Sequence, residues 1–327
     1  MSAGIIRSPT GTALICGATF VIVAAGMHAG ADLLNPVLFA FLIAVLMAPL
    51  QHRLIEKGMP RGAATLVVMG MIVLFCAFLL WVLSTSLVQM GEALPAYQEM
   101  LRVQIERVMS FFPGTGISPG DIPAIPGDSP FRPSIVSVLA GLAGLLAEFF
   151  LVLLVTAFLL PAAGEGWGFG RYSDAVVGHF TARGRAALVT GAGTGFFLAV
   201  IGVDFPLLWG LLVFILSFIP FIGIWIAAIP PIGMAWLEYG TPGAVAVVAG
   251  IAAINLLAER GFATPKAAKV PGLSPAITVV SLFFWTWVLG IPGMFLAVPL
   301  TLAAKTLLES SEETRWLASV METKGPE

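Results

Sequence analysis

Charged side chains are scarce in this sequence of 327 residues. Asp, Glu, Lys and Arg together make up 10% of it, whereas apolar residue types make up 58%. An ordinary soluble domain carries about 25% charged residues. Because a water-soluble core could not bury so much apolar side chain, the composition excludes a soluble protein and predicts an integral membrane protein. Long apolar runs favour helices over a β-barrel, whose strands would alternate in short segments.

Cysteine and histidine are also rare. The two cysteines, Cys16 and Cys76, both lie in apolar runs, so we expect reduced thiols in helices and no disulfide framework. The three histidines, His28, His52 and His179, show no metal-ligand spacing. We therefore expect neither a metal nor a cofactor. The net charge of −2 gives no indication of a nucleic-acid partner, and we expect none.

Motifs of intramembrane enzymes are missing as well. The chain has no His-Glu-x-x-His, no Gly-x-Ser-x-Gly and no close pair of carboxylates in a helix. No nucleotide-binding motif is visible, so transport energy would come from an ion gradient or from the gradient of the solute. The glycines at 191, 193 and 195 are not followed by Lys-Ser/Thr, which favours close helix packing over a phosphate loop. The sequence thus predicts a protein that is not an enzyme.

Two apolar stretches near the C-terminal end, 205–236 and 276–308, are each interrupted in the middle by proline and glycine. The interrupting residues are Pro220 and Gly223 in the first stretch, and Gly290, Pro292 and Gly293 in the second. Each half is about 14 to 17 residues long, whereas a helix needs roughly 20 apolar residues to cross the hydrocarbon core. A pair of interrupted hydrophobic segments is the best pointer in a sequence to a transporter binding site.

The remaining apolar stretches predict further membrane helices, at about 12–28, 36–50, 63–87, 135–160, 186–203 and 244–257. Lys and Arg near helix ends mark the cytoplasmic side. Arg53, Lys57 and Arg61 therefore place the first connecting loop and the N-terminus inside. The chain then divides into three parts. These are three membrane helices in 1–87, an external segment 88–134, and a transport core 135–327 that contains a cytoplasmic link at 161–185 and a basic loop at 258–274.

Two topologies remain open for the C-terminal third. If 205–236 crosses the membrane once, the loop 258–274 with Arg260, Lys266 and Lys269 lies outside, against the positive-inside rule. If both interrupted segments are re-entrant hairpins, that loop and the C-terminus lie inside. The distribution of charge favours the hairpins.

The external segment has its own pattern. Apolar residues recur there at three- and four-residue steps: Leu94, Tyr97, Leu101, Ile105, Val108 and Phe112. This spacing predicts an amphipathic helix, which we expect to pack on the membrane surface or on a neighbouring subunit; a ligand-binding role is the alternative. The stretch 113–133, dense in Pro, Gly and Ser, predicts an irregular connection.

Several motifs between residues 181 and 308 resemble those of the autoinducer-2 exporter family, the PerM-type permeases. They are Thr181–Arg185, Ile219–Gly223, Pro230–Pro231, Asn255–Leu257 with Glu259, Thr264–Lys266, Gly272–Pro275 and Gly293–Leu300. The resemblance implies an all-helical, multi-pass transporter of about eight membrane segments in a bacterial inner membrane, assembled as a homo-oligomer. It also implies export of a small molecule such as autoinducer-2, or exchange of a monovalent cation for H⁺. A passive channel, a scaffold subunit or an intramembrane enzyme are the alternatives.

Glu148 is the acidic residue that lies deepest in an expected membrane helix. A carboxylate at such depth costs roughly 2.5–3.5 kcal/mol on insertion scales, so it should face protein or water. It is either a proton or cation carrier, or a hydrogen-bonded group in a helix contact.

The interrupted segments supply the other candidate residues for binding a solute or ion. Unwound helix ends expose main-chain carbonyl and amide groups that can coordinate cations or polar solutes. The candidates are Ser217, Pro220 and Gly223 on one segment and Gly290, Pro292 and Gly293 on the other. Asn255 and Glu259, four residues apart, share a helix face and form either an intracellular gate or a surface pair. Asp204 is expected to cap the helix that follows it, and cation binding is the alternative.

Overall fold

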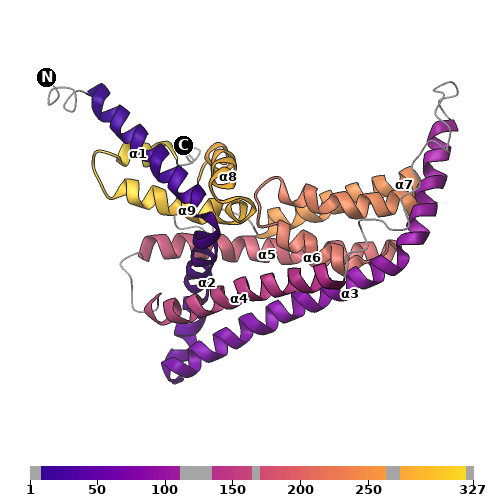
Figure 1. Ribbon diagram of the computed structural model, residues 1–327, viewed down its shortest axis with the longest axis horizontal. Helices are drawn as coiled ribbons and strands as arrows, with labels where there is room; N and C mark the ends of the chain where they lie inside the picture. Colours follow the sequence, from indigo (N-terminus) through magenta and orange to yellow (C-terminus); the bar gives the residue numbers. More distant parts are fainter. Residues whose placement is uncertain (1–8, 111–134, 164–169, 263–272, 322–327) are drawn as a thin grey trace. The chain divides into compact units, whose positions relative to one another are not determined.

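The computed structural model describes residues 9–110, 135–163, 170–262 and 273–321, which form helices and the turns between them (Figure 1). Within the described part of the chain, five helical spans are long and apolar enough to cross a membrane: Ala31–Glu56, Arg61–Ala93, Asp174–Ile201, Gly223–Gly261 and Ile291–Glu309. Shorter apolar helices accompany them at Gly17–Ala29, Ala147–Ala162, Pro206–Leu216 and Pro275–Leu289. The predicted fold class is confirmed, and the chain is a polytopic helical membrane protein.

The helices group into two compact units. The first unit combines Met1–Thr65, Ala147–Val177 and Ala268–Glu327, and the second combines Leu66–Leu146 and Gly178–Ala267. Each unit is therefore assembled from segments that are distant in the sequence.

The first unit is built around a pair of helices near the C-terminus. Helices α8 (Pro275–Leu289) and α9 (Ile291–Glu309) pack against each other, and α1 (Pro9–Ala29) and α2 (Ala31–Glu56) pack on α8 (Figure 1). The short helix α10 (Arg315–Val320) packs on α9. The later part of α4 (Ile135–Ala163) joins this unit, where the Thr156 hydroxyl donates to the Ala40 carbonyl at 3.4 Å.

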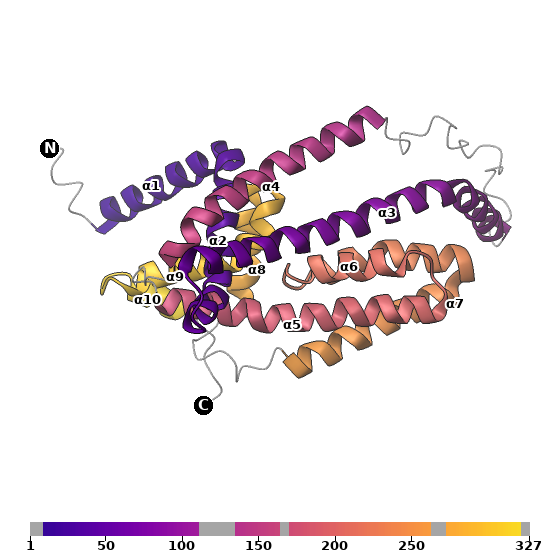
Figure 2. The ribbon, with the colours of Figure 1, turned by 90° about the horizontal axis from the view of Figure 1, so that it is seen from below.

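The second unit contains α6 (Pro206–Leu216), α7 (Gly223–Phe262) and most of α5 (Gly170–Ile201). Its buried apolar core comes from these three helices and the junction between α5 and α6: Leu198, Val203, Leu208, Trp209, Val213, Ile224, Ala227, Ala228, Ala235, Val247 and Ile251. Helices α5 and α6 lie side by side (Figure 2), because Gly191 and Gly195 of α5 face Gly210 of α6. A Cβ on Gly191 would come within 2.7 Å of the Gly210 carbonyl oxygen. The expected role of these glycines in close helix packing is confirmed.

Helix α3 (Arg61–Ser110) differs from the expected bounds. It runs without interruption through the third membrane helix, predicted to end at 87, and on into the amphipathic region. Gln89 and Glu92 between the two parts are good helix formers, and Pro95 removes one main-chain hydrogen bond without ending the helix. The last amphipathic position, Phe112, and the predicted irregular connection lie outside the described residues. The division of the chain into an internal and an external part stays a prediction.

Both predicted interruptions are confirmed. The first apolar stretch is divided into α6 and the beginning of α7, and the second into α8 and α9. With 11 and 15 residues, α6 and α8 extend about 16 and 22 Å, which is less than the roughly 30 Å of the hydrocarbon core. Each short helix packs against the helix that follows it. Helix α7 has a second kink at Gly240, with φ 70° and ψ −161°, so it also includes the helix predicted at 244–257.

Candidate functional site

The first helix break lies in the second unit, between α6 and α7. Residues 217–222 form turns between the end of α6 at Leu216 and the start of α7 at Gly223. Phe221 adopts a left-handed conformation with φ 63°, which is costly for a residue with a side chain. A Cβ on Gly223 would overlap the Leu216 carbonyl oxygen, so only glycine allows the chain to turn back so closely.

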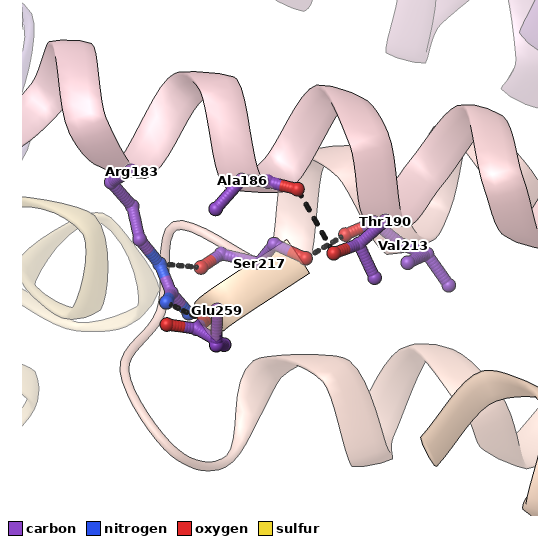
Figure 3. A network of polar contacts seen from close by, with 6 residues as sticks. All are labelled: Arg183, Ala186, Thr190, Val213, Ser217 and Glu259. Atoms are coloured by element: carbon purple, nitrogen blue, oxygen red, sulfur yellow. Dashed lines mark hydrogen bonds and ion pairs between the residues drawn. The ribbon is translucent and has the colours of Figure 1, made fainter. Parts of the chain in front are cut away.

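Arg183 of α5 joins this break to the end of α7 (Figure 3). Its Nε donates a hydrogen bond to the Ser217 carbonyl oxygen at 2.6 Å, and its Nη1 forms an ion pair with Glu259 Oε1. The side chains of Arg183 and Glu259 are 20% and 33% exposed, so the pair is largely shielded from solvent. Three segments that are separate in sequence therefore meet at one guanidinium group.

The chemistry of this contact follows from the helix end. The last carbonyl groups of a helix have no intrahelical donor and carry a partial negative charge. A guanidinium is a planar, permanently charged donor that can serve two acceptors at once. Arg183 thus caps α6 from another helix while it holds the carboxylate of Glu259. Separating these groups would leave a carbonyl and a charge without these partners, which is costly where water does not replace them.

The hydroxyl group of Ser217 does not take part in this contact. It donates to the Val213 carbonyl oxygen of its own helix at 2.6 Å (Figure 3). In the same way the Thr190 hydroxyl donates to the Ala186 carbonyl at 2.9 Å. The contribution of Ser217 to the site is therefore its main-chain oxygen, which already accepts a hydrogen bond from Arg183.

The structure brings together some of the predicted site residues. Ser217, Pro220 and Gly223 lie in the first break, and Glu259 contacts Arg183 beside it. Asn255 lies one turn before Glu259 on α7 and is half-buried. Their binding of a solute or ion stays a prediction.

The second helix break lies in the first unit, between α8 and α9. Gly290 separates the two helices with φ 73° and ψ −153°, and Pro292 occupies the first turn of α9. A Cβ on Gly293 would overlap the Trp285 carbonyl oxygen, which repeats the requirement for glycine seen at Gly223.

Two side chains from the N-terminal helices cap the end of α8. The amide of Asn35 donates to the Leu289 carbonyl oxygen at 3.1 Å, and His28 Nδ1 lies 3.1 Å from the Val288 carbonyl oxygen. The His28 ring also stacks on Trp287, with ring centres 5.8 Å apart. As at the first break, donors from other helices satisfy the carbonyl groups that the interruption leaves free.

Sequence reasoning did not select the three capping side chains. Arg183 was noted only as part of the Thr181–Arg185 motif. Its positive charge in a largely apolar protein is a signal that could have identified it as a site residue. His28 and Asn35 carried no comparable signal, because each acts on a carbonyl more than 250 residues away in the chain.

Two acidic residues have surroundings that their sequence context did not reveal. Glu148 is exposed on α4, and its role as a proton or cation carrier stays a prediction. The interpretation of Asp204 as a helix cap is wrong, since α6 begins after Phe205 without any side-chain cap. The Asp204 carboxylate instead accepts a hydrogen bond from the Tyr97 hydroxyl, because α3 continues past the end of its apolar part.

Comparison with known proteins relates this chain to transport proteins. Residues 169–313 match the family described as AI-2E family transporter. A putative transport protein of Haemophilus influenzae is 28% identical over 93% of this chain and 94% of its own length. The AI-2 transport protein TqsA of Escherichia coli K12 is 29% identical over 89% of this chain and 90% of its own length. The putative transport protein YhhT of the same organism is 25% identical over 93% of this chain and 92% of its own length. The resemblance carried by the motifs of residues 181–308 is thus confirmed: this part of the chain is similar to the AI-2E transporter family, and most of the chain is similar to transport proteins.

Proposed function

We propose that this membrane transporter is a secondary transporter of a small polar solute, and that the first helix break forms part of the solute pathway. The observation that carries the proposal is the contact of Arg183 with both the Ser217 carbonyl and Glu259. A break in a helix at membrane depth is tolerated where protein or a water-filled cavity satisfies its main-chain groups. Here a charged pair does so, and a polar solute can exchange hydrogen bonds with the same groups.

The proposed cycle alternates between two states of this contact. In the state described here, Arg183 holds the end of α6 and Glu259 together. A solute that accepts from the guanidinium and donates to the carboxylate would replace the internal contacts and allow α6 and α7 to shift. Because the relative TqsA is named an AI-2 transport protein, autoinducer-2 is the first solute to test.

Transport can be measured with the purified chain in liposomes loaded with autoinducer-2. We expect efflux that saturates with concentration and becomes faster when a proton or sodium gradient is imposed. Efflux that rises linearly with concentration and ignores both gradients would indicate a passive channel. No flux of autoinducer-2, Na⁺ or Li⁺ above that of protein-free liposomes would contradict the transporter proposal for these solutes and favour a scaffold role.

A second candidate function is exchange of a monovalent cation for H⁺. The position of Glu148 supports this candidate. Its carboxylate lies on α4 within the apolar helix Ala147–Ala162. An ionisable residue in such a segment is commonly functional. Sodium-dependent proton movement, followed with a pH-sensitive dye in the same liposomes, would distinguish ion exchange from export of a neutral solute.

We further propose that the protein is a homo-oligomer of a bacterial inner membrane with both termini in the cytoplasm. The positive charge of the loop after α2 supports this orientation. Single cysteines at positions 241 and 262, in a variant without Cys16 and Cys76, can be labelled from each side of the membrane. Access to position 262 only from outside would contradict the orientation, and cross-linking in native membranes would test the oligomer.

A further inference from the structure

The later part of α3 contacts two helix junctions of the second unit through polar side chains. The hydroxyl group of Tyr97 donates to Asp204 Oδ2 and lies 3.3 Å from Glu238 Oε1. Two turns further along α3, the amide of Gln104 donates to the carbonyl oxygens of Trp236 and Leu237, both at 3.3 Å. Tyr97 and Gln104 are themselves only 8% exposed. This part of α3 is therefore fastened to the rest of its unit and does not rest on it through apolar contact alone.

The two junctions are the places where the first interrupted segment begins and ends. Asp204 precedes α6, and Glu238 lies two residues before the kink of α7 at Gly240. The Tyr239 hydroxyl joins the same junctions directly, since it donates to the Gly202 carbonyl at 2.8 Å. A change in the contacts of Tyr97 would consequently act on both ends of the segment that contains the first break.

The two carboxylates beside Tyr97 have few hydrogen-bond donors. One hydroxyl group faces two carboxylates, and Glu238 Oε2 is buried without a hydrogen-bond partner among the described residues. A buried carboxylate oxygen without a donor is costly, and two ionised carboxylates at one donor repel each other. A single additional proton on Glu238 removes both the charge on its buried oxygen and the repulsion between the carboxylates.

Among the residues that the structure describes, no positively charged side chain contacts these two carboxylates. The titratable groups that face this point are Tyr97 from α3, Asp204 from the junction before α6, and Glu238 and Tyr239 from α7. Arg102 of α3 instead pairs with Glu106 at 3.3 Å, and both side chains are largely exposed. Burial, and then the hydrogen bond to Asp204, raise the pKa of Tyr97 above its usual range, so the phenol acts as a proton donor here.

We propose that the part of α3 around Tyr97 and Gln104 is a proton-operated latch, closed when Glu238 is protonated and open when Glu238 is ionised. In the closed state Tyr97 and the proton on Glu238 together satisfy the two carboxyl groups, and Gln104 holds the end of the first part of α7. The closed state binds one proton more than the open state, so a fall in pH favours closing and a rise in pH favours opening. Where the closed state is protonated and the open state ionised, the ratio of open to closed molecules rises about tenfold per pH unit. The latch is independent of the identity of the transported solute.

The latch can be tested by measuring one distance within the second unit. Spin labels are placed at Val103 of α3 and Thr241 of α7, both exposed, in the full chain with Cys16 and Cys76 replaced by alanine, reconstituted in lipid nanodiscs. Pulsed electron paramagnetic resonance then gives the distance distribution between pH 5.5 and 8.5. We expect one narrow population at low pH and a second, longer population that grows as the pH rises.

Three variants assign the pH response to these side chains. Glu238→Gln replaces the carboxylate by a neutral group of the same shape, and we expect the closed distance at every pH. Tyr97→Phe removes the bridging hydroxyl, and the open population is expected at every pH. Glu106→Gln, an acidic residue of the same helix outside the latch, is the matched control and should behave as the unmodified chain.

A distance distribution that does not change with pH in the unmodified chain would overturn the proposal. So would a pH response that survives Glu238→Gln, or a Tyr97→Phe variant that closes normally at low pH. Size-exclusion chromatography of each variant verifies that the protein is intact, so that a folding defect is not mistaken for an open latch.

Discussion

The Nε atom of Arg183 lies 2.6 Å from the carbonyl oxygen of Ser217, where the helix α6 ends. Continuation of the helix would have supplied main-chain amide groups for the last carbonyls, and the break withdraws them. A side chain from α5 takes their place, and the same side chain pairs with Glu259 at the far end of α7. His28 and Asn35 do the equivalent at the end of α8 within the other unit.

Arg183→Lys should weaken both the fold and transport. Lysine keeps the positive charge but lacks the fork that serves the Ser217 carbonyl and Glu259 together. Loss of one hydrogen bond to a charged group lowers the free energy of unfolding by about 1.5–3 kcal/mol. We expect a lower unfolding midpoint in detergent and a several-fold lower efflux of autoinducer-2 from liposomes.

Arg185→Lys is the matched control for this variant. Arg185 lies two residues further along α5 and is exposed, so the same change should leave both measurements near those of the unmodified chain. Equal losses in the two variants would show that charge on α5, and not the contact with Ser217, is what matters.

Gly223→Ala should destabilise the protein, because the new Cβ would overlap the Leu216 carbonyl oxygen. Overpacking against a rigid main chain costs about 1–3 kcal/mol or more. Gly233→Ala on the same helix meets nothing within 4 Å and should be neutral, or stabilising by up to about 1 kcal/mol. Thermal unfolding of the two variants, compared with Gly293→Ala at the second break, tests the close return of the chain. An unchanged midpoint for Gly223→Ala would contradict it.

Glu148→Gln should reduce transport driven by a pH gradient and leave assembly intact. The change removes the ionisable group and keeps the size of the side chain, which is exposed on α4. Flux in reconstituted vesicles, measured with and without the gradient, gives the result. An unchanged dependence on pH would exclude Glu148 from coupling and leave only a structural role.

Tyr172 should make the fold sensitive to alkaline pH. Burial raises the pKa of this tyrosine to about 12, and its ring stacks on Phe41 at 6.3 Å in the first unit. Above pH 10 the unfolded chain loses the phenol proton while the folded chain keeps it. Stability present below pH 10 is therefore lost between about pH 10 and 12, by up to roughly 2–3 kcal/mol. In Tyr172→Phe this part of the alkaline loss should disappear, and an identical pH profile would contradict the explanation.

Much of the architecture was predictable from local features. The scarcity of charge specified a membrane protein, and runs of apolar residues located most of the helices. Pro220, Gly223, Gly290 and Gly293 marked both breaks, because proline and glycine alter the main chain at the positions where they stand. The motifs of residues 181–308 indicated the resemblance to the AI-2E transporter family that the comparisons confirm.

The contacts that occupy the breaks were not predictable in this way. The carbonyl groups at the ends of α6 and α8 require hydrogen-bond donors. The residues near Ser217 and Leu289 in the sequence do not indicate which side chains these donors are. Asp204 has the local pattern of a helix cap, yet Tyr97 binds it from α3. This contact forms because α3 continues as a helix through residues 88–93. The helix propensity of these residues alone did not require that continuity.

The sequence by itself determined that this chain enters a membrane as helices and where two of them must break, because burial and main-chain geometry depend on the residues at each position. Only the tertiary structure decided which side chains meet the broken ends. Such a partner is selected by proximity after the helices have packed, and Arg183 and Asn35 lie 34 and 254 residues from the carbonyl groups that they cap.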